Sequence, residues 1–114
     1  MDCLSSALVA LKLVGITLST IPAIAINGDF EALGGYMRLG EQPVVILRDP
    51  NNCYVLAHEL VHEFQFERRG EPIGKVEIWR TEVEASAITA NANERYKSVY
   101  GSALAGAERG VVRY

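Results

Sequence analysis

Three features of this 114-residue chain predict a small α+β domain. Apolar residues near the N-terminus recur at helical spacing, short strand-like segments separated by glycine turns follow, and the second half holds two long helical patterns. Hydrophobic residues make up 49% of the chain, which at this length is enough for one core but not for a second. We therefore expect residues 1–114 to form a single domain.

The first expected element is a core helix, followed by a buried strand over residues 20–26. The helical spacing is carried by Leu4, Ala7, Leu8, Leu11, Val14 and Leu18. The same segment has a feature of a signal peptide, because Ala23-Ile24-Ala25 has the small-x-small form of a cleavage site. Against a signal or a membrane span, Asp2 replaces the usual basic residue, and Gly15 and Pro22 break the apolar run. These features favour a cytoplasmic protein over a secreted or membrane-anchored one.

Two further strands are expected over residues 36–39 and 44–48, and the second is the strongest strand signal in the chain. Turn signals at Asn27-Gly28-Asp29, Leu33-Gly34-Gly35 and residues 40–43 separate the strands. Together with the strand over residues 20–26, these two strands predict a short twisted three-stranded sheet. Asn51 and Asn52 then offer an N-cap for the next helix.

The first long helix is expected from residue 53 to residue 67 or 68, before Gly70 and Pro72. Its apolar face is formed by Val55, Leu56, Leu60, Val61 and Phe64, while Glu63 and Glu67 are expected on a solvated face and Gln65 in a structural hydrogen bond. The second helix is expected from residue 74 or 75 to about residue 95, with Trp79 in the core. Residues 96–114 are rich in glycine and alanine and predict at most one or two further helical turns.

The first long helix contains His58-Glu59-Leu60-Val61-His62, and His58 and His62 are the only histidines in the chain. Positions four apart share one face of a helix, so both imidazoles can bind a single zinc ion. Glu59 lies about 100° round the helix from His58. That places it beside the fourth coordination position, where a water would bind.

A hydrolytic zinc site needs a third protein ligand. No third histidine exists, which excludes the longer pattern with a downstream His-x-x-Gly-x-x-His, so a carboxylate must serve. Glu82 ranks first because it lies on the apolar side of the second helix with Ala85, whose small side chain lets the two helices approach. Glu84 ranks second and Glu77 third.

These motifs resemble those of the gluzincin metallopeptidases, in particular the minimal single-domain minigluzincins and related small phage-type metallopeptidases. The resemblance rests on the His-Glu-x-x-His pattern followed by Gln65 and on the segment Glu82-Val83-Glu84-Ala85-Ser86, and it covers residues 6–95. It implies a zincin-like fold in which His58, His62 and Glu82 bind Zn²⁺. It also implies a peptide or protein substrate that pairs with an edge strand, here residues 44–48.

The chain departs from the family pattern at two points. The family's aspartate after alanine is Ser86 here, which weakens the expected hydrogen bond to a ligand histidine. The tyrosine or histidine that often stabilises the oxyanion has no evident equivalent. The remaining candidates for that role are Tyr96, Tyr100, Tyr114, Arg95 and Arg109.

The implied activity is hydrolysis of peptide bonds, as by an endopeptidase. Zinc lowers the pKa of its bound water to about 7, and Glu59 takes the proton as general base and passes it to the leaving amine. The alternative is a non-catalytic or latent metal-binding domain, structural or interacting, with the same fold and a blocked cleft. Glu59 favours the enzyme because a structural zinc has no use for a general base. Manganese, cobalt or iron would also fit these ligands.

The remaining composition bears on other partners. The net charge is −3 and Arg68-Arg69 is the only basic pair, which argues against nucleic-acid binding.

Cys3 and Cys53 lack a Cys-x-x-Cys partner. Two buried free thiols are therefore expected, with a disulfide as the alternative, because small disulfide scaffolds usually carry more cysteines. The oligomeric state is not indicated.

Overall fold

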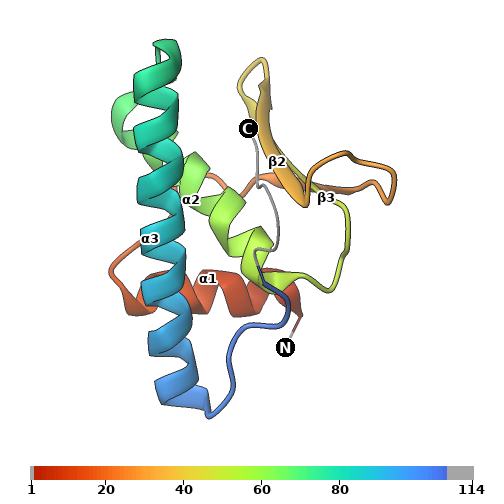
Figure 1. Ribbon diagram of the computed structural model, residues 1–114, viewed down its shortest axis with the longest axis vertical. Coiled ribbons are helices and arrows are strands. Elements are labelled where there is room, and N and C mark those ends of the chain that lie inside the picture. The colour runs from red at the N-terminus through yellow and green to blue at the C-terminus, as the bar shows by residue number, and fades with distance from the viewer. Residues whose placement is uncertain (1, 108–114) are drawn as a thin grey trace.

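The computed structural model describes residues 2–107 and confirms the α+β class. Its elements are α1 (Cys3–Leu13), β1 (Ala23–Ile26), β2 (Gly34–Leu39), β3 (Gln42–Leu47), α2 (Cys53–Arg69) and α3 (Gly74–Tyr100). The three-stranded sheet and all three helices were expected from the sequence. α2 runs through the middle of the molecule, between α3 and the sheet (Figure 1).

The sheet has the strand order β1-β3-β2. β1 pairs with β3 in parallel, and β2 pairs with β3 in an antiparallel hairpin that turns at Gly40 and Glu41. Gly40 has a φ of +64°, which glycine adopts without a steric penalty. β3 is therefore the central strand, and the expectation that residues 44–48 form an edge is wrong. The order of the strands along the chain did not show that β1 pairs with β3 on the side opposite β2.

The N-terminal segment differs from expectation in two respects. α1 ends at Leu13, and Gly15 follows with a φ of +83°, so Leu18 lies outside the helix. β1 begins at Ala23 and is mostly exposed, with Ile26 at 51%, so the expected buried strand is wrong. Its position at an edge of the sheet explains the exposure. Within residues 2–107, none of the helices has the length and apolar character needed to cross a membrane.

Cys3 and Cys53 form a disulfide, so the expectation of two free thiols is wrong. The bond joins the first residue of α1 to the first residue of α2, with the two Cα atoms 4.8 Å apart. The cysteines are 50 residues apart in the chain. Their pairing follows from the meeting of two helix N-termini, which no local sequence pattern reports.

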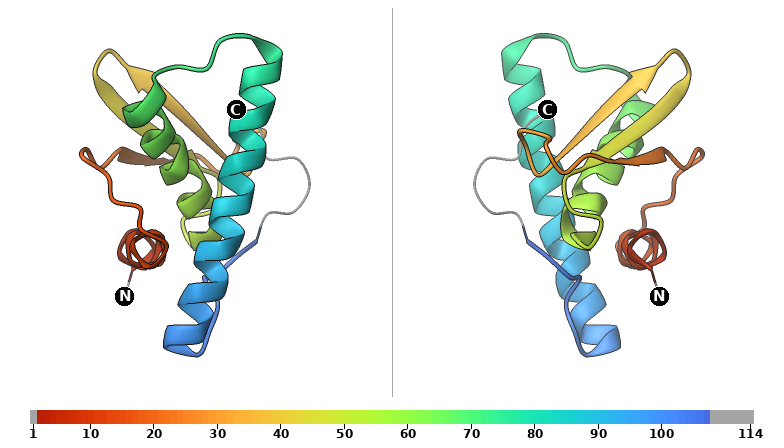
Figure 2. Two further views of the ribbon diagram at one scale, coloured as in Figure 1. Left: turned by 90° about the vertical axis from the view of Figure 1, so that its left-hand side faces the viewer. Right: turned by 90° about the vertical axis from the view of Figure 1, so that its right-hand side faces the viewer.

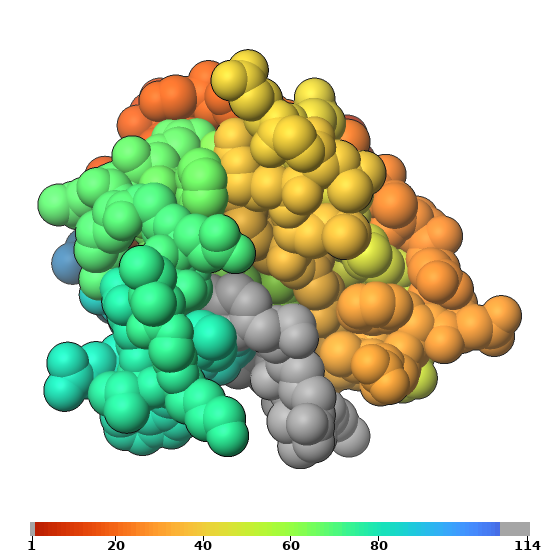
Figure 3. All heavy atoms as spheres, turned by 90° about the horizontal axis from the view of Figure 1, so that it is seen from above, coloured from red at the N-terminus to blue at the C-terminus, as the bar shows by residue number. Residues whose placement is uncertain are grey.

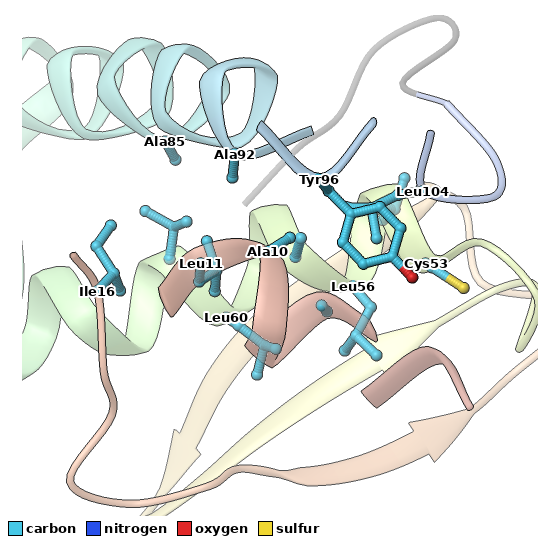
Figure 4. Close-up of a cluster of buried hydrophobic side chains, with 14 of the residues drawn as sticks. Ala10, Leu11, Ile16, Cys53, Leu56, Leu60, Ala85, Ala92, Tyr96 and Leu104 are labelled. Atoms are coloured by element: carbon cyan, nitrogen blue, oxygen red, sulfur yellow. The ribbon is translucent and has the colours of Figure 1, made fainter. Parts of the chain in front are cut away.

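α2 is the most buried element, with 11 of its 17 residues in the interior. Asn52 caps it by accepting a hydrogen bond from the backbone of Val55 at 3.0 Å, as expected. α1, α3 and the sheet all pack against it, and Figure 2 shows the sheet on one side of α2 and α3 on the other. The apolar side chains at this junction come from all three helices and include Ala10, Leu11, Leu56, Leu60, Ala85 and Ala92 (Figure 4).

α3 is longer than predicted and more exposed at its start. It continues to Tyr100, where Gly101 adopts a φ of +82° and ends it, rather than stopping near residue 95. Trp79 is 64% exposed, so its expected place in the core is wrong. The helical period identified an apolar face but could not show how much of that face another element covers.

Candidate metal centre

Three candidate ligands, two from α2 and one from α3, converge between these helices. One ligand atom from each of His58, His62 and Glu82 lies within 4.8 Å of the others. His58 Nε2 is 2.5 Å from Glu82 Oε1, and His62 Nε2 is 3.3 Å from Glu82 Oε2. Both imidazoles thus present the same ring nitrogen to one carboxylate. Two imidazole nitrogens and a carboxylate oxygen are a donor set that suits zinc.

The burial of the two histidines and the charge of Glu82 suit the binding of a cation. The side chains of His58 and His62 are 0% and 2% exposed, while that of Glu82 is 22% exposed. Burial alone raises the pKa of Glu82, but its hydrogen bonds with the two histidines outweigh burial and lower that pKa to about 2. Glu82 is therefore a carboxylate at neutral pH, which is the form that binds a metal.

The two lower-ranked glutamates are engaged elsewhere. Glu84 Oε1 accepts a hydrogen bond from Gln65 Nε2 at 2.9 Å and pairs with Arg69. Glu77 Oε2 accepts the backbone N–H of Ile73 at 3.1 Å, at the start of α3. The structure therefore brings Glu82 to the histidines, and not Glu84 or Glu77.

Glu59 is buried beneath β2, with only 1% of the residue exposed. A Cβ atom built on Gly34 would lie 3.1 Å from Glu59 Cγ and 3.2 Å from Glu59 Oε2. The missing side chain of Gly34 thus makes room for the glutamate. The sequence suggested a loop at Gly34, whereas the residue begins β2 and brings that strand over the candidate site.

Gln65 connects His62 to α3. His62 Nδ1 is 2.8 Å from Gln65 Oε1, and Gln65 Nε2 donates to the backbone oxygen of Thr81 at 2.9 Å. The sequence assigned Gln65 a structural hydrogen bond, and the structure places that bond on a candidate metal ligand.

A second polar cluster lies beside His62 and consists of Tyr36, Arg38 and Glu63. Glu63 is only 1% exposed, so its expected place on a solvated face is wrong. It accepts a hydrogen bond from the Tyr36 hydroxyl and another from Arg38 Nη1 at 2.8 Å. The ring centroids of Tyr36 and His62 are 6.2 Å apart. Sequence analysis missed Tyr36 and Arg38, although two residues apart on a strand is the spacing of one face.

Burial shifts the protonation equilibria of this cluster. It raises the pKa of Glu63 to about 7, with a further contribution from the hydrogen bond to Glu67. Burial and the hydrogen bond with Glu63 also raise the pKa of Tyr36. Glu67 is exposed, as expected, and accepts the backbone N–H groups of Ser19 and Thr20 at 2.9 and 3.1 Å.

A cleft of about 800 Å³ opens next to His62. Its walls are the β2–β3 hairpin, the end of α2 and the first turns of α3, and Figure 3 shows these parts side by side on one face of the molecule. The lining residues include Met37, Arg38, Phe66, Ile73, Val76 and Arg80. This volume lies within the range of about 300–1,000 Å³ that is typical of ligand-binding clefts.

The tyrosines and arginines that the sequence offered for oxyanion stabilisation lie elsewhere or outside the described residues. The Tyr96 hydroxyl is 3.4 Å from Ser6 Oγ on α1, and the rings of Tyr96 and Tyr100 are 4.7 Å apart. Arg95 lies thirteen residues after Glu82 on α3 (95 − 82 = 13), about 20 Å along the helix axis. Tyr114 and Arg109 are outside the described residues.

Comparisons of the chain with models of protein families, with curated proteins and with solved structures gave no match. A functional assignment therefore has to come from the residues of this site.

Proposed function

We propose that this protein is a zinc-dependent metallopeptidase that hydrolyses internal peptide bonds. The observation that carries the proposal is the convergence of His58, His62 and Glu82, whose ligand atoms lie within 4.8 Å of one another, with Glu59 one residue after the first histidine. Zinc bound to these three residues would activate a water molecule and polarise the carbonyl of the scissile bond.

The chain's own residues supply the acid–base chemistry. His58 and His62 each offer an imidazole nitrogen, and Glu82 offers the charge that balances part of the dication. Glu59 acts as general base and then donates the proton to the leaving amine. Its position beneath β2, one residue after His58 on α2, supports this role because it places the carboxylate beside the candidate ligands.

An extended peptide is the substrate class that fits this site. β2 is an edge strand, and its first residue, Gly34, lies directly over Glu59. Edge strands can pair with an added extended chain through their free backbone groups. β2 thus takes the role that the sequence suggested for residues 44–48, and the cleft beside His62 accommodates side chains of the substrate.

Arg38 is the residue we assign to binding a substrate carbonyl. Its guanidinium is held by Glu63 at 2.8 Å, by the backbone oxygen of Glu41 at 2.9 Å and over the ring of Phe66 at 4.0 Å. The side chain keeps 22% of its surface exposed in the cleft. A guanidinium fixed in this way loses little entropy when it binds an oxygen atom.

The metal site is tested by the zinc content of the purified protein after saturation with zinc. Wild type is compared with Glu82→Gln and with the matched control Glu77→Gln, which changes the same residue type on the same helix. One zinc per chain in wild type and in the control, together with its loss in Glu82→Gln, would support the site. Wild type that takes up no zinc would contradict it.

The activity is tested separately with a peptide library analysed by mass spectrometry. Wild type is expected to cleave internal bonds, and Glu59→Gln is expected to keep its zinc but to cleave about 10²- to 10⁴-fold more slowly. Zinc-loaded wild type that cleaves no peptide would contradict the peptidase and leave a metal-binding domain.

A further inference from the structure

We propose that Gln65 is the positioning residue of this metal centre. It sets the tautomer of His62 and holds α3 at the residue that precedes Glu82. The inference rests on the metal-binding part of the proposed function but not on peptide hydrolysis.

The neighbours of Gln65 fix the orientation of its amide group. Nε2 lies 2.9 Å from the backbone oxygen of Thr81 and 2.9 Å from Glu84 Oε1, and both of these atoms accept hydrogen bonds. The opposite orientation would place the amide oxygen against two acceptors. Glu84 Oε1 is also paired with Arg69, so the atom that faces Nε2 is the acceptor of an ion pair.

The amide oxygen of Gln65 is therefore the atom that faces His62 Nδ1, at 2.8 Å. An amide oxygen only accepts, so Nδ1 must carry the proton. With the proton on Nδ1, the nitrogen that can give a lone pair to a metal is Nε2, the atom that lies 3.3 Å from Glu82 Oε2. Gln65 thus selects the tautomer that presents the correct nitrogen to a metal.

Gln65 also joins the two helices at the level of the ligands. It follows His62 by three residues on α2, and its backbone partner, Thr81, immediately precedes Glu82 on α3. Gln65 is 3% exposed and Thr81 is 9% exposed, so these hydrogen bonds lie in a nearly dry interface where they are strong. A single side chain therefore fixes a ligand from one helix and the backbone beside a ligand from the other.

The test combines zinc affinity with NMR of the histidine rings in Gln65→Met. Methionine is unbranched and of similar length but forms none of the three hydrogen bonds. We expect the zinc affinity, measured by competition with a chelator, to fall about 10- to 100-fold, as is typical when a ligand histidine loses its outer partner. In metal-free, ¹⁵N-histidine-labelled wild type, Nδ1 of His62 should be protonated. In Gln65→Met, that proton should shift toward Nε2.

The chain offers its own controls for this experiment. His58 serves as the internal reference, since the chain has only two histidines, and Gln42→Met changes the only other glutamine, on β3. Glu84→Gln is a second variant at a 42% exposed side chain and guards against misfolding of Gln65→Met. It should give a smaller loss of affinity and the same direction of change at His62.

Two outcomes separate this inference from the proposed function. Unchanged zinc affinity and unchanged His62 signals in both Gln65→Met and Glu84→Gln would overturn the role of Gln65, even if zinc binds and peptides are cleaved. If wild type bound no zinc, the proposed function would fail, and the metal-free spectra alone would decide whether Gln65 sets the tautomer of His62.

Discussion

Gly34 of β2 packs directly against Glu59 of α2, the residue to which we assign the role of general base. A Cβ atom at position 34 would lie 2.6 Å from Val55 Cγ1 and 3.1 Å from Glu59 Cγ. Val55 is fully buried and cannot move aside easily. Glycine at this position is therefore a condition for β2 to lie so close to the candidate site.

Gly34→Ala should destabilise the fold and disturb the site. The added methyl group forces β2 and α2 apart, which we expect to cost about 1–3 kcal/mol in the free energy of unfolding. Urea denaturation and the rate of peptide cleavage would both report the change. Gly28→Ala is the control, because a Cβ there meets no atom within 4 Å. A Gly34→Ala protein as stable and as active as wild type would show that the strand is not held against Glu59 as described.

Zinc should stabilise the folded protein through the same three ligands. A ligand that binds only the folded state at about 1,000 times its Kd adds about 4 kcal/mol to the free energy of unfolding. We therefore expect thermal melts with excess zinc to shift upward in wild type, and a chelator to reverse the shift. Glu82→Gln should show little response to zinc, and a full response in this variant would mean that Glu82 is not a ligand.

Protonation of Glu63 should make stability depend on pH between about 4.5 and 7. Its folded pKa is about 7, against an ordinary value of 4.5, because the side chain is buried. Within this window the folded state keeps a proton that the unfolded state has lost. The contribution of Glu63 to the free energy of unfolding is therefore fully present below pH 4.5 and is lost as the pH rises toward 7. Glu63→Gln removes this dependence.

The measurement is the free energy of unfolding of wild type and Glu63→Gln, both metal-free, at several pH values from 4.5 to 7.5. The advantage of the variant over wild type should grow as the pH rises. Glu94→Gln, at an exposed position on α3, should track wild type throughout. A difference that stays constant with pH would mean that Glu63 ionises normally.

The features that sequence analysis predicted correctly are those determined by local spacing. α2 and α3 begin where their turn and cap residues indicate, and His58 and His62 face the same direction because four residues make about one helical turn. Glu82 ranked above Glu84 and Glu77 from its helical face and from the small Ala85 beside it. The structure places it with the histidines, while its role as a metal ligand stays a prediction.

The features that it missed depend on contacts between distant segments. Three such contacts are the pairing of β1 with β3, the burial of Glu63 under Tyr36, and the hydrogen bond from Gln65 to Thr81. Each joins two segments that are distant in the chain, and neither segment has a sequence pattern that indicates the other. Glu63 looked like a surface residue because its helical position is polar. It is buried because β2 crosses over α2 at that point, which only the three-dimensional fold determines.

The Cys3–Cys53 disulfide should contribute substantially to stability without being needed for the metal site. A cross-link that closes a loop of 50 residues lowers the entropy of the unfolded chain, which corresponds to about 4 kcal/mol. The double variant Cys3→Ser/Cys53→Ser should therefore unfold at a lower urea concentration than wild type. It should still bind one zinc per chain, because the proposed ligands belong to α2 and α3 and lie away from α1 in the sequence.

Wild type treated with a reducing agent is the matched comparison, because it loses the same bond without a change of sequence. Reduced wild type and the double variant should have similar unfolding midpoints, both below that of oxidised wild type. Equal midpoints for oxidised and reduced wild type would show that the bond adds nothing to stability. Loss of zinc binding in the double variant under conditions where it remains folded would show instead that α1, through this bond, helps to position His58 and His62.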